Sequence, residues 1–337
     1  MVSLDDIVQE AIDRQATDIH VEMDAPIYWR QGEAMVRSDS VFTRDILDEV
    51  YKRCGCQVVG CKNLSVDAAC TCQGLRIRVH LYAVQQKVCG TLRLLYQRQL
   101  GLGDSEEDKL LKDLSLKTDG LILITGPTGS GKSYTLASCI TYINQEAAKH
   151  IVTLEDPVEY MFTNDKSLIH QRELHRDVAS MAGGVRDALR EDPDIIMIGE
   201  LRDRETLEAA LQAAETGHLV FATMHTQRAI TAIQRMISLF PGEQQEEVRN
   251  QLAQVLRAII CQHLTRIDAE FVTIRDILLN TTAVSNLIRQ KKEPQILSVQ
   301  ETQKPMQTME MAVHELESKW GRRQELREVL HTSYGTV

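Results

Sequence analysis

The chain has 337 residues, of which 43% are apolar and 26% are charged, and its formal net charge is −10 at pH 7. This length is sufficient for about two domains of ordinary size, each with its own core. The acidic balance argues against binding nucleic acid by broad attraction to its phosphates, which depends on Lys and Arg, and an aromatic content of 4% leaves few platforms for base stacking.

The apolar runs of the chain are short. Runs such as LILI and AII fall far below the roughly 20 residues that a membrane span requires. The first residues, MVSLDDIVQE, have no basic segment followed by an apolar one, which is the pattern of a secretory signal. We therefore expect a cytoplasmic protein that inserts no helix into a membrane.

The first 96 residues predict a small α+β domain. Ser3 and Asp6 have the spacing of a capping box, and apolar residues follow them at helical spacing. The segment DIHVE, at 18–22, then predicts a strand. Residues 74–96 alternate charged and apolar side chains over two further β-rich segments. We expect this domain to occupy residues 1–96.

A second domain is predicted beyond a linker and leading helix at 97–117. Apolar strands alternate there with helical stretches, and the predicted strands are 121–125, 150–155, 194–200 and 218–224. This alternation predicts a parallel sheet covered by helices. We expect the domain to span 118–292 and a helical tail to span 293–337.

One long helix is predicted over 243–264. The sequence EQQEEVRNQLAQVLRAIICQHL places five apolar residues on one helical stripe, namely Val248, Leu252, Val255, Ile259 and Leu264. The prediction therefore makes this whole segment a single helix.

Five of the eight cysteines lie close together, namely Cys54, Cys56, Cys61, Cys70 and Cys72. In a cytosolic chain, clustered thiols suggest a metal before a disulfide. The spacing C-x-C-x4-C-x8-C-x-C lacks the C-x2-C pairs of common zinc sites, however. We favour reduced, partly buried thiols, and zinc is the alternative.

The strand at 121–125 leads into GPTGSGKS, which matches the phosphate-loop pattern G-x4-GK-[ST] in the required strand-loop-helix setting. Glycines let backbone N–H groups surround a phosphate, and the following helix N-terminus adds its dipole. We expect Lys132 to reach the β- and γ-phosphates of ATP and Ser133 to ligate Mg²⁺. The predicted ATP-binding residues are Gly126, Pro127, Thr128, Gly129, Ser130, Gly131, Lys132, Ser133 and Tyr134.

Two carboxylates stand at the ends of apolar strands, Glu155 in IVTLEDPVEY and Glu200 in DIIMIGE. One would hold Mg²⁺ through water and the other would polarise the attacking water, and the residues by themselves leave open which does which. His218 and His225 bracket another strand. Because they lie at its opposite ends, only His225 shares the carboxyl edge with the two carboxylates, where it could sense the γ-phosphate.

Four segments together resemble motifs of the secretion ATPase superfamily, which serves type II secretion, type IV pili and DNA uptake. GPTGSGKS is similar to its Walker A motif, IVTLEDPVEY to its Asp box, LREDPDIIMIGELRDRET to its Walker B motif and AAETGHLVFATMHT to its His box, in the order of the family. Within it the chain looks most like the pilus retraction ATPases, over roughly residues 4–320. The resemblance implies an α/β, RecA-like P-loop ATPase domain preceded by a smaller, PAS-like α+β domain.

The resemblance also assigns roles to residues. It makes Glu155 the catalytic carboxylate, Glu200 the Walker B acid that holds Mg²⁺ through water, and His225 a neighbour of the nucleotide. It further implies that Arg78 and Arg93, from the N-terminal domain, close onto the phosphates of their own chain or of a neighbour. Two guanidinium groups on an apolar sheet need anionic partners, and surface salt bridges are the alternative to a phosphate.

The function implied is that of a cytoplasmic homo-hexamer, peripheral at the inner face of the cell membrane, which hydrolyses Mg·ATP. It would act on an inner-membrane pilus platform protein and power type IV pilus retraction and twitching motility. The alternative is an ATPase for pilus assembly, type II secretion or competence DNA uptake. Assembly and secretion members usually carry a tetracysteine zinc module in the C-terminal half, whereas only Cys139 and Cys261 lie beyond residue 100 here. In AVSNLIRQ, Ser285 replaces an arginine of the retraction enzymes.

Overall fold

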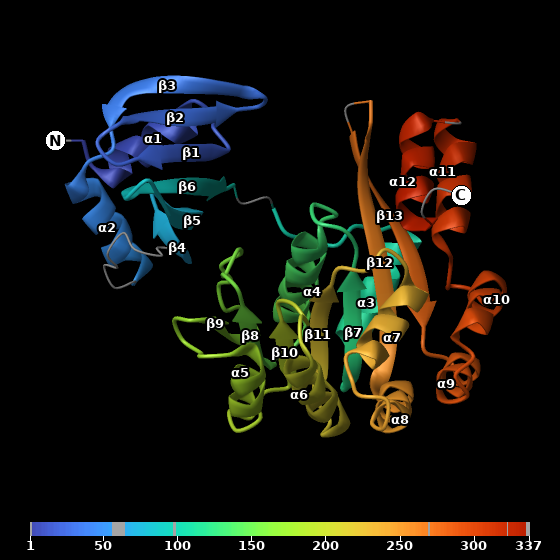
Figure 1. Ribbon diagram of the computed structural model, residues 1–337. Helices are drawn as coiled ribbons and strands as arrows, with labels where there is room; N and C mark the ends of the chain where they lie inside the picture. The colour runs from blue at the N-terminus through green and yellow to red at the C-terminus, as the bar shows by residue number, and fades with distance from the viewer. Residues whose placement is uncertain (1, 56–64, 97–98, 269, 322, 335–337) are drawn as a thin grey trace. The chain divides into compact units, whose positions relative to one another are not determined.

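The structure is a computed structural model that describes residues 2–55, 65–96, 99–268, 270–321 and 323–334 (Figure 1). The chain divides into two units, one formed by Met1–Gln99 with Asp156–Met161 and the other by Leu100–Glu155 with Phe162–Val337. Among the described residues, no helix combines the length and the apolar composition that crossing a membrane requires.

The N-terminal unit contains an antiparallel sheet with the strand order β3-β2-β1-β6-β5-β4. Its strands are β1 (Asp18–Glu22), β2 (Pro26–Gln31), β3 (Ala34–Val41), β4 (Ser65–Cys72), β5 (Leu75–Val84) and β6 (Lys87–Leu95), and its helices are α1 (Leu4–Asp13) and α2 (Arg44–Cys54). The predicted capping box is present at the start of α1, where the Asp6 N–H donates to Ser3 Oγ and the Ser3 N–H donates to the Asp6 carboxylate.

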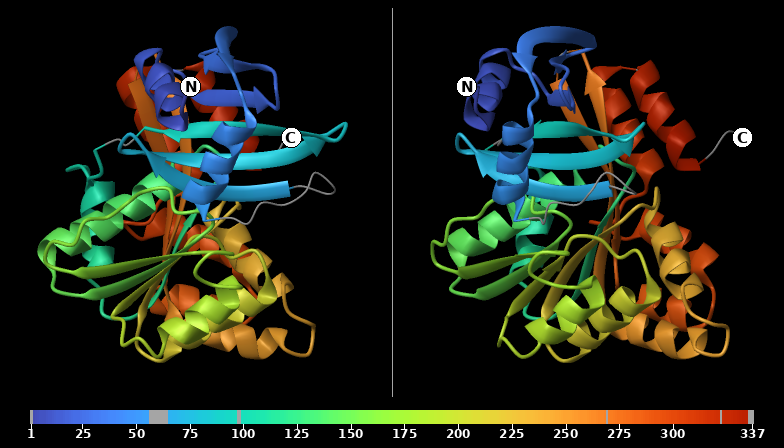
Figure 2. Two further views of the ribbon diagram at one scale, coloured as in Figure 1. Left: turned by 90° about the vertical axis from the view of Figure 1, so that its left-hand side faces the viewer. Right: turned by 60° about the vertical axis from the view of Figure 1, so that its left-hand side comes forward.

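One face of this sheet is apolar because alternate residues of its strands face the helices. Ile77, Val79 and Leu81 of β5 are buried in one core with Ile46 and Val50 of α2. Figure 2 shows α2, in blue, lying across the strands. The residues between these apolar positions, including the predicted Arg78, point to the opposite face of the sheet.

The second unit is built on a sheet with the order β13-β12-β7-β11-β10-β8-β9. All neighbouring strands are parallel except the β12–β13 pair, which confirms the predicted parallel sheet. The strands are β7 (Gly120–Thr125), β8 (His150–Glu155), β9 (Leu168–Glu173), β10 (Ile195–Ile198), β11 (Leu219–Met224), β12 (Leu256–Ile267) and β13 (Glu270–Leu279).

Helices cover both faces of this sheet. They are α3 (Glu106–Ser115), α4 (Lys132–Glu146), α5 (Met181–Ala188), α6 (Arg204–Glu215), α7 (Ala229–Ser238), α8 (Gln245–Val255), α9 (Thr282–Arg289), the short η1 (Glu293–Gln295), α10 (Ile296–Thr302), α11 (Met309–Trp320) and α12 (Gln324–Tyr334). Leu121 and Leu123 of β7 belong to a core shared with α5 to α10. Ile122 and Ile124, which alternate with them, belong to a core shared with α3 and α4.

The long helix predicted over 243–264 is wrong. Helix α8 ends at Val255, and strand β12 begins at Leu256 and pairs in parallel with β7. Both faces of β12 are covered, so Ala258, Ile259 and Ile260 are all fully buried. A strand buried on both faces has a continuous apolar run, which hydrophobic periodicity alone does not distinguish from a buried helix.

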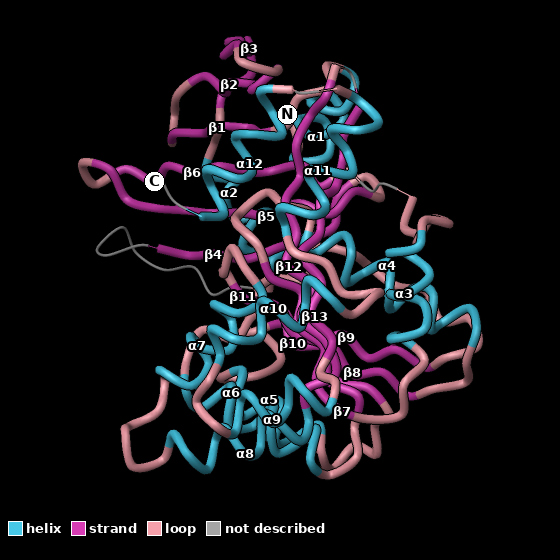
Figure 3. Tube along the Cα trace, turned by 90° about the vertical axis from the view of Figure 1, so that its right-hand side faces the viewer, coloured by secondary structure: helices cyan, strands magenta, loops and turns pink. Residues whose placement is uncertain are grey.

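The last two helices of the predicted helical tail, α11 and α12, pack against the far ends of β12 and β13, which are seen as a long pair of strands in Figure 3. Met309 and Val313 of α11 and Leu326 of α12 form a separate core with Ile267 and Ile274 of the two strands. The tail thus extends the second unit beyond the body of the sheet.

Candidate functional site

The phosphate loop connects the end of β7 to the start of α4. Gly126 and Gly131 have φ angles of 143° and 83°, which only glycine adopts readily. A Cβ on Gly126 would lie 2.2 Å from the backbone oxygen of Gln262. Helix α4 begins at Lys132 directly after Gly131, and no side chain caps it. Its first N–H groups therefore face the loop, which is an arrangement that suits an anion.

Lys132 contacts several groups at the phosphate loop. Its ammonium group is buried and donates to the backbone oxygens of Gly126 and Pro127 at 2.9 and 3.0 Å. It also donates to Nδ1 of His225 at 3.3 Å. Of the other predicted loop residues, Ser130 is buried and Tyr134 half-buried, whereas Thr128, Gly129 and Ser133 are exposed.

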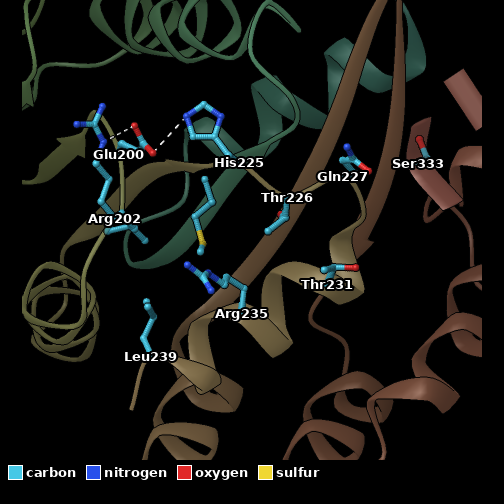
Figure 4. A pocket seen from close by; sticks show the side chains of 11 residues that line it. Glu200, Arg202, His225, Thr226, Gln227, Thr231, Arg235, Leu239 and Ser333 are labelled. Atoms are coloured by element: carbon cyan, nitrogen blue, oxygen red, sulfur yellow. Dashed lines mark hydrogen bonds and ion pairs between the residues drawn. The ribbon is translucent and has the colours of Figure 1, made fainter. Parts of the chain in front are cut away.

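His225 joins the lysine to the acidic residue that follows β10. Its Nε2 lies 3.2 Å from Oε1 of Glu200. Because Nδ1 accepts from the Lys132 ammonium group, Nε2 carries the proton and donates to the carboxylate. The other carboxylate oxygen of Glu200 accepts from Nε of Arg202 at 2.8 Å. Lys132, His225, Glu200 and Arg202 thus form one continuous row of contacts, part of which is drawn in Figure 4.

The backbone around Glu200 is fixed by its neighbouring strands. The N–H of Gly199 donates to the oxygen of Leu154 in β8, and the N–H of Leu201 donates to the oxygen of Thr223 in β11. Glu200 therefore stands between two strand ends. The side chain is 20% exposed, so the carboxylate remains accessible from the edge of the sheet.

Glu155 ends β8 at the same edge. The residue is 7% exposed, and Oε1 of its carboxylate accepts from Thr153 Oγ1 at 2.7 Å and from Gln171 Nε2 at 3.0 Å. These two bonds fix the orientation of a buried acid that lies one strand away from Glu200. His218 lies at the other end of β11, where Nδ1 contacts the backbone oxygen of Ala213 at 3.0 Å. The structure thus separates the two histidines as predicted.

A cavity of about 660 Å³ opens beside this row. Glu200, Arg202 and His225 line one part of it, and Arg235 and Ser333 line another (Figure 4). The phosphate loop is not part of its lining, whereas His225, which contacts Lys132, is.

The donor set suits a magnesium nucleotide. Backbone N–H groups and a lysine are ligands for phosphate oxygens, and a hydroxyl and a carboxylate are hard oxygen donors of the kind that Mg²⁺ takes. Ser133 supplies the hydroxyl at the start of α4 and Glu200 supplies the carboxylate.

Arg78 and Arg93 lie in the N-terminal unit, directly opposite each other on β5 and β6. Arg78 binds both carboxylate oxygens of Asp67, at 3.1 and 2.5 Å, and Arg93 binds Asp18 at 2.7 Å. The Arg93 side chain is 62% exposed. Each guanidinium therefore has a carboxylate partner within its own unit and does not belong to the unit that contains the phosphate loop.

Sequence reasoning missed Gln262 and Thr135. The Gln262 side chain is buried, donates to the backbone oxygen of Ser130 at 2.7 Å and accepts from Thr135 Oγ1 at 3.0 Å. The predicted helix hid this contact, because a residue at the end of a covering helix would not reach the loop. A glutamine directly after the apolar run AIIC was the available signal, because a glutamine that continues a buried run needs hydrogen-bond partners.

The cysteine cluster is described only in part, because Cys56 and Cys61 lie outside the described residues. Cys54, Cys70 and Cys72 are buried. Burial raises the pKa of the Cys72 thiol to about 12, and its hydrogen bond to Asp5 raises it too, so Cys72 is a protonated thiol. Among the described residues there is no group of three or more His, Cys, Asp or Glu placed to hold a metal ion.

Known proteins with similar sequences include an uncharacterized protein of Escherichia coli K12, YggR, and the type IV pilus retraction ATPase PilT of Pseudomonas aeruginosa. The chain is 40% identical to YggR over 306 residues, which cover 89% of this chain and 93% of that protein. It is 44% identical to the Pseudomonas protein over 230 residues, which cover 67% of this chain and 65% of that protein.

Among solved structures, the crystal structure of the pilus retraction motor PilT with bound ADP is similar with a TM-score of 0.85 at 39% identity, and the match covers 98% of this chain and 97% of that one. Residues 62–334 match the family described as type II/IV secretion system protein. These findings confirm the resemblance and the fold class predicted from the motifs. The chain belongs to the type II/IV secretion system protein family.

Proposed function

We propose that this chain is a motor ATPase that hydrolyses Mg·ATP to power type IV pilus retraction and twitching motility. The observation that carries the proposal is the row of contacts from Lys132 through His225 to Glu200 at the mouth of the phosphate loop. It is supported by the family of the chain and by its similarity to proteins named as retraction ATPases and motors.

The phosphates of ATP lie on the N–H groups of the loop 126–134, and Lys132 leaves its carbonyl partners to bind the β- and γ-phosphates. Ser133 and Glu200 would hold Mg²⁺, and the ion would supply a positive charge that stabilises the charge developing on the phosphate oxygens.

Glu155 orients the attacking water. Its hydrogen bonds from Thr153 and Gln171 hold the carboxylate in one orientation at the sheet edge, which is what a water-positioning group requires. Burial at 7% exposure keeps bulk water away from this acid. In this division of roles, Glu200 would hold the metal and Glu155 orients the attacking water.

The contacts of His225 depend on whether the γ-phosphate is present. The anion competes with Nδ1 of His225 for the Lys132 ammonium group, so binding of ATP changes a contact that the imidazole shares with Glu200. Helix α7 begins four residues after His225, at Ala229, and a change at the imidazole is thereby passed to a helix of the unit.

Arg78 and Arg93 complete the site by closing onto the phosphates, exchanging Asp67 and Asp18 for the stronger anion. Closure and release of the N-terminal unit drive a homo-hexameric ring. That ring sits in the cytoplasm at the inner face of the cell membrane and works against the membrane platform protein of the pilus.

The experiment that tests the proposal measures steady-state Mg·ATPase activity of the purified chain beside Lys132→Ala and Glu155→Gln, with the mass of the assembly read on the same samples. Glu10→Gln is the matched control, because Glu10 pairs with Arg14 within α1 of the N-terminal unit, outside the four motifs. We expect a hexamer whose activity both site variants abolish and the control retains.

Retraction itself is tested by expressing the chain in a bacterium that lacks its retraction ATPase and measuring twitching on agar. Recovery by the wild type and not by Glu155→Gln supports the proposal. A hydrolysing hexamer that restores no twitching would overturn retraction and leave assembly, secretion or DNA uptake as the work performed.

A further inference from the structure

A buried contact to the phosphate loop comes from strand β12, which lies outside the sequence motifs of the site. Cys261 of β12 is the register partner of Thr125, the last residue of β7, so Gln262 comes level with the first residue of the loop. The side chain of Gln262 is 1% exposed. Its backbone oxygen packs so closely against Gly126 that a Cβ there would lie 2.2 Å away.

Both ends of the Gln262 amide are bound to the loop and to the helix that follows it. Nε2 donates to the backbone oxygen of Ser130 at 2.7 Å, and Oε1 accepts from Thr135 Oγ1 at 3.0 Å. Thr135 lies in the first turn of α4, where its N–H donates to the oxygen of Gly131. One side chain thus links the loop to the start of the helix.

An amide is an unusual choice at this position. The neighbouring residues of β12, Ile260 and Cys261, are fully buried, and an apolar side chain of similar size would fill the same space. Such a residue would leave the Ser130 oxygen and the Thr135 hydroxyl without these partners in a buried region. The hydrogen bonds of Gln262 therefore hold the loop in one shape.

We infer that Gln262 is a positioning residue for nucleotide binding, which sets the spacing between the phosphate loop and the N-terminus of α4. The inference rests on the proposed function only in that the loop binds a nucleotide. Because the loop N–H groups contact the phosphates both before and during hydrolysis, losing their alignment raises the KM for ATP more than it lowers kcat.

The test measures binding of Mg·ADP by calorimetry to the full chain and to Gln262→Glu and Gln262→Met. At about pH 8 a carboxylate at this position still accepts from Thr135 but repels the Ser130 oxygen, so we expect Gln262→Glu to bind at least about tenfold more weakly than the wild type. Near pH 5.5 the buried carboxyl is protonated and donates again, so its affinity relative to the wild type recovers. Gln262→Met shows no such recovery.

The matched control is Gln300→Met. Gln300 is also a buried glutamine of this unit, and its Nε2 donates to Asp276 and to the backbone oxygens of Ile277 and Gln307, which lie outside the phosphate loop. We expect it to lower the melting temperature while leaving the affinity for Mg·ADP unchanged.

The inference is overturned if the Gln262 variants bind Mg·ADP as tightly as the wild type. It is also overturned if Gln300→Met loses as much affinity as they do. A Gln262→Glu variant whose affinity is reduced equally at both pH values would overturn it too. If Gln262→Met does not fold, as thermal unfolding shows on the same samples, the pH series of Gln262→Glu decides alone. Wild-type binding of Mg·ADP without ATP hydrolysis would overturn the proposed function and not this inference, whereas absence of wild-type binding overturns both.

Discussion

The ammonium group of Lys132 donates to Nδ1 of His225 at 3.3 Å, and this contact joins the phosphate loop to the carboxylate side of the site. It requires the imidazole to accept at Nδ1, so its proton is on Nε2, which lies 3.2 Å from the Glu200 carboxylate. The tautomer is therefore set by its two neighbours, and the histidine is poised between a cation and an anion.

Replacing His225 with Ala removes this link. We expect kcat for ATP to fall about 100-fold, because Lys132 and Glu200 lose the group that aligns them. The side chain is 47% exposed, so the free energy of unfolding should change by only about 0.5 kcal/mol. Steady-state kinetics and urea unfolding of the same preparation measure both. Unchanged kcat would mean that His225 only fills space beside the lysine.

Gly126→Ala should damage the loop more than Gly129→Ala. Both glycines have positive φ angles, but a Cβ on Gly126 meets the Gln262 oxygen at 2.2 Å, whereas a Cβ on Gly129 meets nothing within 4 Å. We expect Gly126→Ala to lose about 1–3 kcal/mol more unfolding free energy than Gly129→Ala, because a backbone atom must move. Urea unfolding of the two variants measures the difference, and equal losses would show that Gly126 is not packed tightly against the Gln262 backbone.

The Arg93→Ala variant tests whether Arg93 forms only a surface salt bridge or also contacts the nucleotide. Arg93 binds Asp18, and Lys87 of the same strand binds Glu22 at 2.6 Å with similar exposure. Exposed pairs of this kind are screened by solvent and contribute little to stability, so both Arg93→Ala and Lys87→Ala should change the free energy of unfolding little.

The two variants should differ in activity. We expect Arg93→Ala to lower kcat/KM for ATP by at least about tenfold through loss of a charge on the phosphates, and Lys87→Ala to leave it unchanged. Steady-state kinetics on assembled protein measure this. Equal activity in both variants would leave Arg93 with a structural salt bridge alone.

Asp276 predicts a pH dependence of stability. This carboxyl, on β13, accepts from the N–H of Ala229 at the start of α7 and from Gln300. Burial raises its pKa to about 6, against the opposing effects of these hydrogen bonds and of Arg228. Since the pKa is higher in the folded chain than in the unfolded chain, the folded state binds more protons between the two values, and stability falls as pH rises through this window.

The Asp276→Asn variant lacks that titration. Between about pH 4 and pH 7 the wild type should lose on the order of 3 kcal/mol of unfolding free energy that the variant does not lose. Urea unfolding at a series of pH values measures both curves. A constant difference between them across this range would show that Asp276 has the same pKa in both states.

The phosphate loop and the acidic strand ends could be predicted from the sequence because each depends on a few consecutive residues. GPTGSGKS needs only a preceding strand and a following helix, and Glu155 and Glu200 each end an apolar run of their own. The order of the four motifs also identified the family. The local spacing of residues is sufficient to predict these features, and the fold keeps them as predicted.

The contacts between residues of the site could be predicted only with knowledge of the order of the strands in the sheet. β7 and β8 are consecutive in the chain, yet β11 and β10 lie between them, and β7 is flanked by β11 and β12. This order brings His225, which follows β11, to Lys132, and brings Gln262 to Ser130. Neither pair is near in sequence, so no local pattern could predict it.

The sequence by itself determined that the chain has a phosphate loop, two acidic strand ends and the motifs of its family, because local spacing encodes them. Only the tertiary structure decided that residues 256–267 form a strand, since burial on both faces gives strand and helix the same apolar run. It also decided the carboxylate partners of Arg78 and Arg93, because cross-strand pairing joins residues distant in the chain.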